Sequence, residues 1–214
     1  MIFRLDERIL FPDPSLADED GLLAVGGDLS VERLLLAYQN GIFPWYSDDT
    51  PILWYSPHER FVLFPVELKI TKSMRQVLRS ARFRVTYDQR FTKVIEACSI
   101  ARREGQDGTW ITDDMKAAYT RLHQEGHAHS VEVWENDEIV GGLYGVEVGE
   151  VFCGESMFNN VSNASKVALV SLCQSGKYAL IDCQVHTGHL ESMGARLIGR
   201  KEYILILQNA GVKG

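Results

Sequence analysis

An acid and an amide stand two residues apart in a short apolar segment late in the chain. Residues 178–185 carry Asp182 and Gln184 among Leu, Ile, Cys and Val. If this segment is a strand, alternate side chains share a face, so that both polar groups point the same way. Burying such groups without partners costs ~1–3 kcal/mol each. They therefore form either a satisfied core network or a polar pair at the floor of a cleft, in which Asp182 orients the Gln184 amide.

A second acid has apolar neighbours earlier in the chain. Glu155 stands between Gly154 and Ser156, flanked by Phe152 and Met157. An acid at a strand end with apolar neighbours is typical of a receptor for a cationic group with apolar walls. A structural turn has the same composition, so both interpretations stay open.

Aromatic residues are concentrated in turn-rich segments. Residues 43–55 hold five of them, and Trp110 precedes an expected helix cap. Loop aromatics can stack on an unpaired base, worth ~1–3 kcal/mol per base, or wall an apolar pocket. A small hydrophobic core explains most of them, but we assign a substrate-binding role to Trp45 and Trp110 as a hypothesis.

A basic segment stands out because the whole chain carries a net charge of −7. Nucleic acid binding through the entire surface would require the opposite sign, so any RNA contact must come from a local patch. Residues 69–84 contain six basic residues and no acid, and a helix would place four of them on one stripe. A solvated face is the ordinary explanation, whereas a track for the phosphate backbone is the functional one. The six are Lys69, Lys72, Arg75, Arg79, Arg82 and Arg84.

The composition argues against disordered, membrane-spanning and exported classes of protein. The chain is 45% apolar, so it can bury a core, and no apolar run approaches the ~20 residues of a membrane span. The amino terminus lacks the features of a signal peptide, and the four cysteines are scattered. We expect a cytoplasmic protein without a metal site.

The elements that must position these residues alternate between helical and strand periods. We expect an α+β fold: a small loop-rich N-terminal domain over residues 1–64, then a catalytic domain over 65–214, with the boundary near Phe64 and Pro65. The second domain has a mixed or antiparallel sheet flanked by helices, the element order of a GNAT-type acyltransferase. Helices are expected at 31–39, 71–80, 91–103, 112–125 and 163–174, strands at 130–134, 138–146, 150–153 and 178–185, and a helix–strand–helix at 189–209.

Eight segments spread over nearly the whole chain form a specific set. Residues 21–30, 41–45, 52–57, 108–112, 126–132, 152–158, 163–166 and 181–184 read GLLAVGGDLS, GIFPW, ILWYSP, GTWIT, GHAHSVE, FCGESMF, NASK and IDCQ. In these segments the chain resembles the leucyl/phenylalanyl-tRNA–protein transferases. The resemblance implies a GNAT-like second domain, no metal or coenzyme, and a monomer. It also implies transfer of Leu or Phe from aminoacyl-tRNA to the α-amine of proteins beginning with Arg or Lys, which marks them for degradation.

The resemblance also implies roles for individual residues. Trp45 and Trp110 would contact the terminal adenosine and its surroundings, and Glu155 would lie at the acceptor side. Asp182 and Gln184 would be the catalytic pair, with Gln184 aligning the attacking amine and the proton leaving through Asp182, water or a ribose hydroxyl. Tyr119, Phe152 and Met157 would line the aminoacyl end, together with Leu143 and Leu172, where some members carry Met and Phe. The loop between Cys173 and Asp182 is short.

Two other functions use the same features differently. An acyl-CoA-dependent N-acetyltransferase would need a Gly-rich R/Q-x-x-G-x-G/A loop before the central helix, but residues 159–164 read NNVSNA. A non-catalytic RNA-binding module would explain the basic segment and the aromatics. It would leave Glu155, Asp182 and Gln184 without a role.

Overall fold

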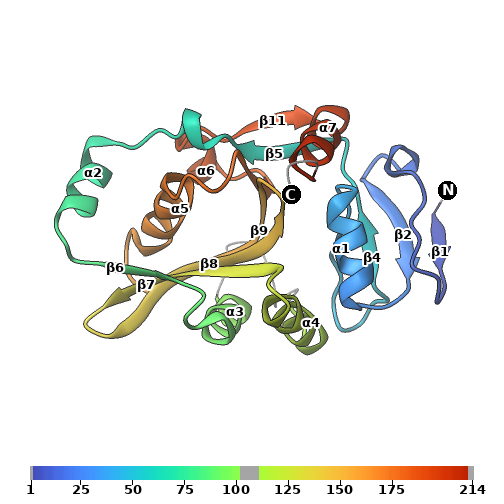
Figure 1. The fold of residues 1–214 in the computed structure, drawn as a ribbon, viewed down its shortest axis with the longest axis horizontal. Helices are drawn as coiled ribbons and strands as arrows, with labels where there is room; N and C mark the ends of the chain where they lie inside the picture. Colours follow the sequence, from blue (N-terminus) through green and yellow to red (C-terminus); the bar gives the residue numbers. More distant parts are fainter. Residues whose placement is uncertain (1, 102–110, 212–214) are drawn as a thin grey trace.

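The computed structural model describes residues 2–101 and 111–211. Its helices and two sheets confirm the expected α+β class (Figure 1). A small sheet in the order β1-β2-β4-β3 lies at one end of the molecule, with α1 beside it. This unit contains β1 (Phe3–Leu5), the 3-10 turn η1 (Pro14–Leu16), β2 (Leu22–Gly26), α1 (Val31–Gln39), β3 (Phe43–Pro44) and β4 (Leu53–Tyr55).

Local chemistry sets the bounds of α1 where the sequence predicted them. The Ser30 side chain accepts a hydrogen bond from the Arg33 N–H and so caps the first turn. Gly41 follows the helix with a φ of +69°, a conformation that favours glycine. The chain then enters β3, which carries Phe43 toward the larger sheet.

The larger sheet has seven strands in the order β11-β5-β10-β9-β8-β7-β6. Strands β6 to β9 form an antiparallel meander, and α5 then crosses over to β10, which pairs parallel to β9. The members are β5 (Glu59–Leu63), β6 (Arg84–Tyr87), β7 (Ala128–Glu135), β8 (Glu138–Val148), β9 (Val151–Asn159), β10 (Leu180–Gln184) and β11 (Arg196–Gly199).

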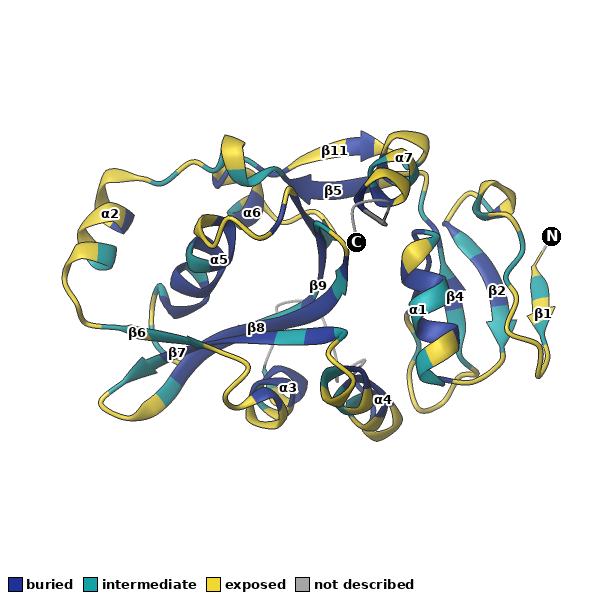
Figure 2. Cartoon of the chain, in the orientation of Figure 1, coloured by how far each residue is buried: buried dark blue, intermediate teal, exposed yellow. Residues whose placement is uncertain are grey.

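Helices cover both faces of this sheet, and the buried residues lie between these layers (Figures 1 and 2). Helices α3 and α4 pack on one face and α5 on the other. Within the described residues, no helix combines the length and apolarity needed to cross a membrane. The helical segments are η2 (Pro65–Glu67), α2 (Lys72–Arg79), α3 (Phe91–Ile100), α4 (Asp113–Gln124), α5 (Ala164–Gln174), α6 (Gly188–Ser192) and α7 (Arg200–Gly211).

Three expectations about the elements need correction. β9 runs to Asn159 instead of ending at Cys153, because it pairs with β8 along its whole length. The change from one sheet to the other occurs before Glu59, since β5 pairs with β10 and β11; the division at residue 64 therefore places a strand of the large sheet in the small domain. α3 ends at Ile100, because Ala101 is extended, so the helix stops short of the expected end at residue 103, which lies outside the described residues.

Candidate active site

A cavity of about 500 Å³ opens between the small unit and the large sheet. Aromatic residues Phe43, Trp45 and Tyr55 line it from the small unit. Strands β9 and β10 supply its polar floor, and α5 supplies apolar side chains. The cavity is thus built by segments from both ends of the chain.

The structure brings most of the predicted site residues to this cavity. Tyr119 lies instead behind Glu155, fully buried, and does not line it. Trp110 lies outside the described residues. Those that line the cavity are Trp45, Leu143, Phe152, Glu155, Met157, Leu172, Asp182 and Gln184.

Asp182 is held by a buried cation that the sequence analysis missed. Its carboxylate forms an ion pair with Arg60, whose Nε lies 3.4 Å from Oδ1, and it accepts a 2.7 Å hydrogen bond from the Tyr203 hydroxyl. The Arg60 guanidinium lies between the rings of Phe43 and Tyr203, 4.7 and 4.6 Å from their centroids. Arg60 and Asp182 are almost completely buried, so this pair anchors the floor of the cavity.

One feature of the sequence indicated that Arg60 is buried and paired. It directly precedes the apolar run Phe61, Val62, Leu63, and a charged residue at the start of a buried strand requires a buried partner. Its partner is 122 positions away in the chain, so no local pattern could pair the two residues.

Gln184 departs from the alternation expected of its strand. The register shifts between Asp182 and Gln184, and Gln184 has a φ of +60°. This conformation is costly for a residue with a Cβ, and such strain is concentrated at functional sites. Asp182 therefore accepts from the Gln184 backbone N–H at 2.9 Å, whereas the expected bond to the side-chain amide does not form.

The Gln184 amide is oriented by Glu155 instead. Gln184 Nε2 donates to Glu155 Oε1 at 2.7 Å across the β9–β10 boundary. Glu155 keeps only 7% of its surface exposed, and burial raises the pKa of its carboxyl to about 7. Hydrogen bonds that stabilise the carboxylate oppose this rise without cancelling it.

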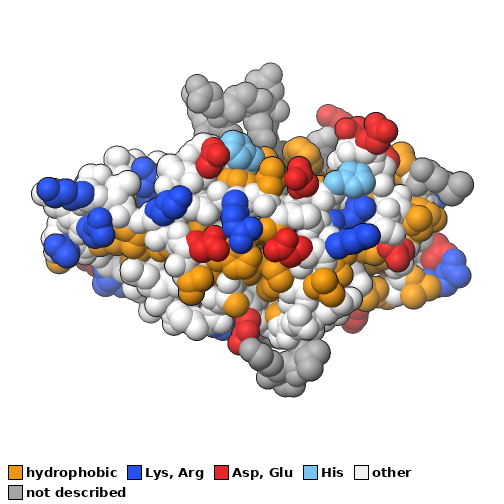
Figure 3. Space-filling view, turned by 90° about the horizontal axis from the view of Figure 1, so that it is seen from above, with side chains coloured by type: hydrophobic (Ala, Val, Ile, Leu, Met, Phe, Trp, Pro, Cys, Tyr) orange, Lys and Arg blue, Asp and Glu red, His pale blue; other side chains and the backbone are white. Residues whose placement is uncertain are grey.

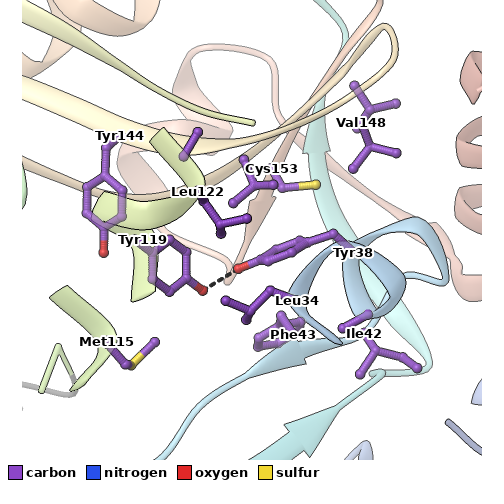
Figure 4. Packing of buried hydrophobic residues seen from close by; sticks show 14 of the residues in the cluster. Leu34, Tyr38, Ile42, Phe43, Met115, Tyr119, Leu122, Tyr144, Val148 and Cys153 are labelled. Carbon is purple, nitrogen blue, oxygen red and sulfur yellow. Dashed lines mark hydrogen bonds between the residues drawn. The ribbon is translucent and has the colours of Figure 1, made fainter. Parts of the chain in front are cut away.

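Two tyrosines from different helices hold the other side of Glu155. Tyr38 of α1 donates to Oε1 at 2.7 Å, and Tyr119 of α4 donates to Oε2 at 3.2 Å. The two hydroxyls also contact each other, and Figure 4 shows them meeting between the helices. Burial and the charge of Glu155 raise the pKa of both phenols, so both are neutral donors.

The remaining wall of the cavity is mostly apolar. Side chains from β8, β9, α5 and β10 form it, including Leu143, Met157, Leu169, Leu172 and Ile181. Among the described lining residues three are carboxylates and none is Lys or Arg. Such a space accepts an apolar side chain and repels anions. In the part of the chain that the structure describes, no group of His, Cys, Asp or Glu residues has the geometry of a metal site.

The six basic residues predicted to contact the tRNA backbone do not lie at the cavity. Those on and next to α2 gather at the end of the molecule remote from the small unit (Figure 3). The expected stripe is shorter than predicted, because α2 ends at Arg79. Arg82 forms an ion pair with Glu135 at 2.5 Å, and Arg84 lies 3.9 Å from Asp137. Exposed cations on α2 are Lys72, Arg75 and Arg79.

Comparison with known proteins gives matches along the chain. A family model described as leucyl/phenylalanyl-tRNA protein transferase matches residues 62–208, and the model of that family's N-terminal domain matches residues 27–58. The chain is 58% identical over 209 residues to the leucyl/phenylalanyl-tRNA–protein transferase of Syntrophobacter fumaroxidans, covering 96% of this chain and 89% of the relative. It is 52% identical over 211 residues to that of Flavobacterium johnsoniae, covering 97% and 100%.

Similar solved structures are more distant in sequence. A GCN5-related N-acetyltransferase from Kribbella flavida aligns with a TM-score of 0.40 at 9% identity, covering 74% of this chain and 57% of that one. A functionally unknown conserved protein from Staphylococcus epidermidis aligns with a TM-score of 0.47 at 8% identity, covering 83% and 68%.

Proposed function

The chain belongs to the leucyl/phenylalanyl-tRNA–protein transferase family, and from this premise we propose how its cavity performs the reaction. The protein is a transferase that moves an amino acid from aminoacyl-tRNA to a protein. We propose that the donor is Leu- or Phe-charged tRNA and that the acceptor is the α-amine of a protein beginning with Arg or Lys. The added residue would then mark that protein for degradation.

The bond between Gln184 and Glu155 at the floor of an apolar cavity carries this proposal. An aminoacyl ester is already activated, so the enzyme's main task is to hold amine and carbonyl in attack geometry, an effect worth up to ~7–11 kcal/mol. Gln184 bonds to Glu155 through Nε2, so the amide oxygen Oε1 takes no part in that bond and can accept a hydrogen bond from the attacking amine. Leu143, Met157 and Leu172 supply an apolar surface for the Leu or Phe side chain.

The carboxylates lining the cavity support a cationic acceptor. Asp182 is neutralised by Arg60, whereas Asp20 lines the cavity from the small unit and is exposed. Tyr55 lines the same side, and an aromatic ring there can attract a guanidinium by a cation–π interaction. We assign the side chain of the acceptor's first residue to this side and its α-amine to Glu155 and Gln184.

Mass spectrometry tests the proposed function directly. The purified protein is mixed with Leu- or Phe-charged tRNA and a peptide beginning with Arg, and the product should be heavier by one Leu or Phe residue. The same peptide with an acetylated N-terminus is the control and should stay unchanged. An Arg-headed peptide left unmodified with both donors would contradict the proposal.

A further inference from the structure

Two carboxylates lie at the floor of the cavity, and their surroundings separate their roles. Asp182 Oδ1 lies 2.9 Å from the Gln184 N–H, and Oδ2 lies 2.7 Å from the Tyr203 hydroxyl. Arg60 pairs with the same carboxylate in a fully buried position. Protonating Asp182 would leave the guanidinium unpaired in the core, which is strongly unfavourable. The Asp182 carboxylate is therefore already committed to three partners, Arg60, Tyr203 and the Gln184 backbone.

Glu155 has no such restriction. Its described hydrogen-bond donors are the neutral Tyr38 and Tyr119 hydroxyls and the Gln184 amide. A proton can be added to this carboxylate without leaving a charged partner behind. The tyrosine hydroxyls can also adapt, since a hydroxyl rotates and can accept from a protonated carboxyl.

We propose that Glu155 is the catalytic base that takes a proton from the acceptor's α-ammonium group before the amine attacks. This inference rests on the proposed transfer reaction and adds the step that the family assignment leaves open. It replaces the relay through Asp182 that the sequence left possible. Asp182 is a positioning residue that fixes the backbone of Gln184.

The proton balance of the step is complete. The α-ammonium gives one proton to the Glu155 carboxylate, and the neutral nitrogen attacks the ester carbonyl carbon. The new C–N bond forms, the C–O bond to the ribose breaks, and the second proton of the nitrogen passes to the departing ribose oxygen. Glu155 then loses its proton to solvent, which accounts for the single proton released.

The titratable groups that face Glu155 come from three elements besides its own. Tyr38 lies on α1, Tyr119 on α4 and Asp182 on β10, while Cys153 precedes Glu155 on β9. Burial, and to a smaller extent the charge of Asp182, raise the pKa of Glu155 to about 7. An α-ammonium has a pKa of about 7.7–8.0, so the transfer is nearly balanced and Glu155 is matched to neutral pH.

A pH series of single-turnover rates tests the proposal with Glu155→Gln, which keeps the size of the side chain. The wild type and the variant transfer Phe to an Arg-headed peptide from about pH 6 to about pH 9. We expect the variant to be slower by ~10²–10⁴-fold at the acidic end. The deficit should shrink to roughly tenfold or less at the alkaline end, because solvent then deprotonates the amine without help.

Tyr38→Phe provides an independent arm. Removing its hydrogen bond to Glu155 raises the pKa of that carboxyl, so the acidic limb of the wild-type profile should move to higher pH. This variant decides the matter if Glu155→Gln fails to fold in a thermal melt. A deficit of Glu155→Gln that is constant across the series, or a limb that Tyr38→Phe leaves in place, would overturn the proposal. A wild type that transfers nothing at any pH would instead contradict the proposed function.

Discussion

At the scale of single residues, the two buried acids show how surroundings assign chemistry. Both are carboxylates with little exposed surface, and both bond to Gln184. Asp182 faces the Arg60 guanidinium, whereas Glu155 faces neutral donors and can take up a proton without leaving a charged partner behind. The sequence pointed to both acids but paired Gln184 with the wrong one.

Gln184→Ala tests the role of the amide. The variant should reduce the rate of transfer by ~10²-fold, because the amine loses its alignment. The affinity for an aminoacyl-adenosine donor should stay near that of the wild type. Single-turnover rates and donor titrations measure the two effects separately. Gln208→Ala, an exposed position on α7, is the matched control and should change neither. Unchanged transfer by the Gln184 variant would remove the amide from the mechanism.

Leu172→Phe tests the apolar pocket. Leu172 lines the cavity from α5, so the larger ring should reduce the space for the donor's side chain. Differences of this kind are worth ~1–3 kcal/mol, and we expect Phe-charged tRNA to lose at least tenfold relative to Leu-charged tRNA. Competition between the two donors gives the ratio. An unchanged ratio would place the donor's side chain elsewhere.

At the scale of elements, α2 lies away from the cavity, and none of its residues lines it. Its exposed face carries Lys72, Arg75 and Arg79, and none of these forms an ion pair within the part of the chain that the structure describes. Met74 and the partly buried Val77 and Leu78 attach the opposite face to the core. The helix thus presents unneutralised charge at the end of the molecule opposite the small unit, as a phosphate track requires (Figure 3).

Charge reversal on α2 tests whether this track binds the tRNA. Arg75→Glu with Arg79→Glu should weaken tRNA binding and reduce the slope of log affinity against log salt by about one per lost phosphate contact. Transfer from a minimal aminoacyl-adenosine donor should persist. Lys93→Glu with Lys201→Glu makes the same charge change at exposed positions on α3 and α7 and is the control. Equal loss with both donors would refute the role of the helix.

At the scale of the whole molecule, Arg60 joins three parts of the fold. From β5 it pairs with Asp182 on β10, donates to the Gly41 carbonyl at 3.4 Å and lies against Tyr203 of α7. The small unit, the large sheet and the C-terminal helix therefore meet at one buried charge. A defect at this point should affect stability and the site together.

Arg60→Met should destabilise the protein by ~3–5 kcal/mol, since it leaves the Asp182 carboxylate buried without its cation. Chemical denaturation measures the change. The double variant Arg60→Met with Asp182→Asn removes both charges and should recover part of the loss, which gives a non-additive cycle. Additive effects would show that the pair does not act as a unit.

Glu155 should make stability depend on pH in an unusual direction. Burial raises its pKa from 4.5 to about 7, so the folded state binds this proton more tightly than the unfolded chain. The tighter binding of this proton adds to the free energy of unfolding. The contribution is complete below pH 4.5 and disappears as pH rises through about 7, a change on the order of 3 kcal/mol. The free energy of unfolding of the wild type should therefore fall by this amount relative to Glu155→Gln across that window. If the free energies of unfolding of the wild type and Glu155→Gln changed in parallel with pH, this prediction would be wrong.

The sequence by itself determined the helices, the strands from β7 to β11 and the family. Ser30, Thr71 and Thr112 cap their helices where the local pattern placed the starts, because capping depends on neighbouring residues. The motifs around Glu155 and residues 181–184 identified the residues of the cavity floor, because a motif is also read from neighbouring residues. These signals lie within a few positions of one another in the chain.

Only the tertiary structure decided which partner each polar group has. Arg60 meets Asp182, and Tyr38 meets Glu155, across separations of 122 and 117 positions. The bulge at Gln184 turned its amide from Asp182 to Glu155, and strand pairing rather than local pattern set the length of β9. Partners of buried charges are fixed by the packing of distant elements, which periodicity does not encode.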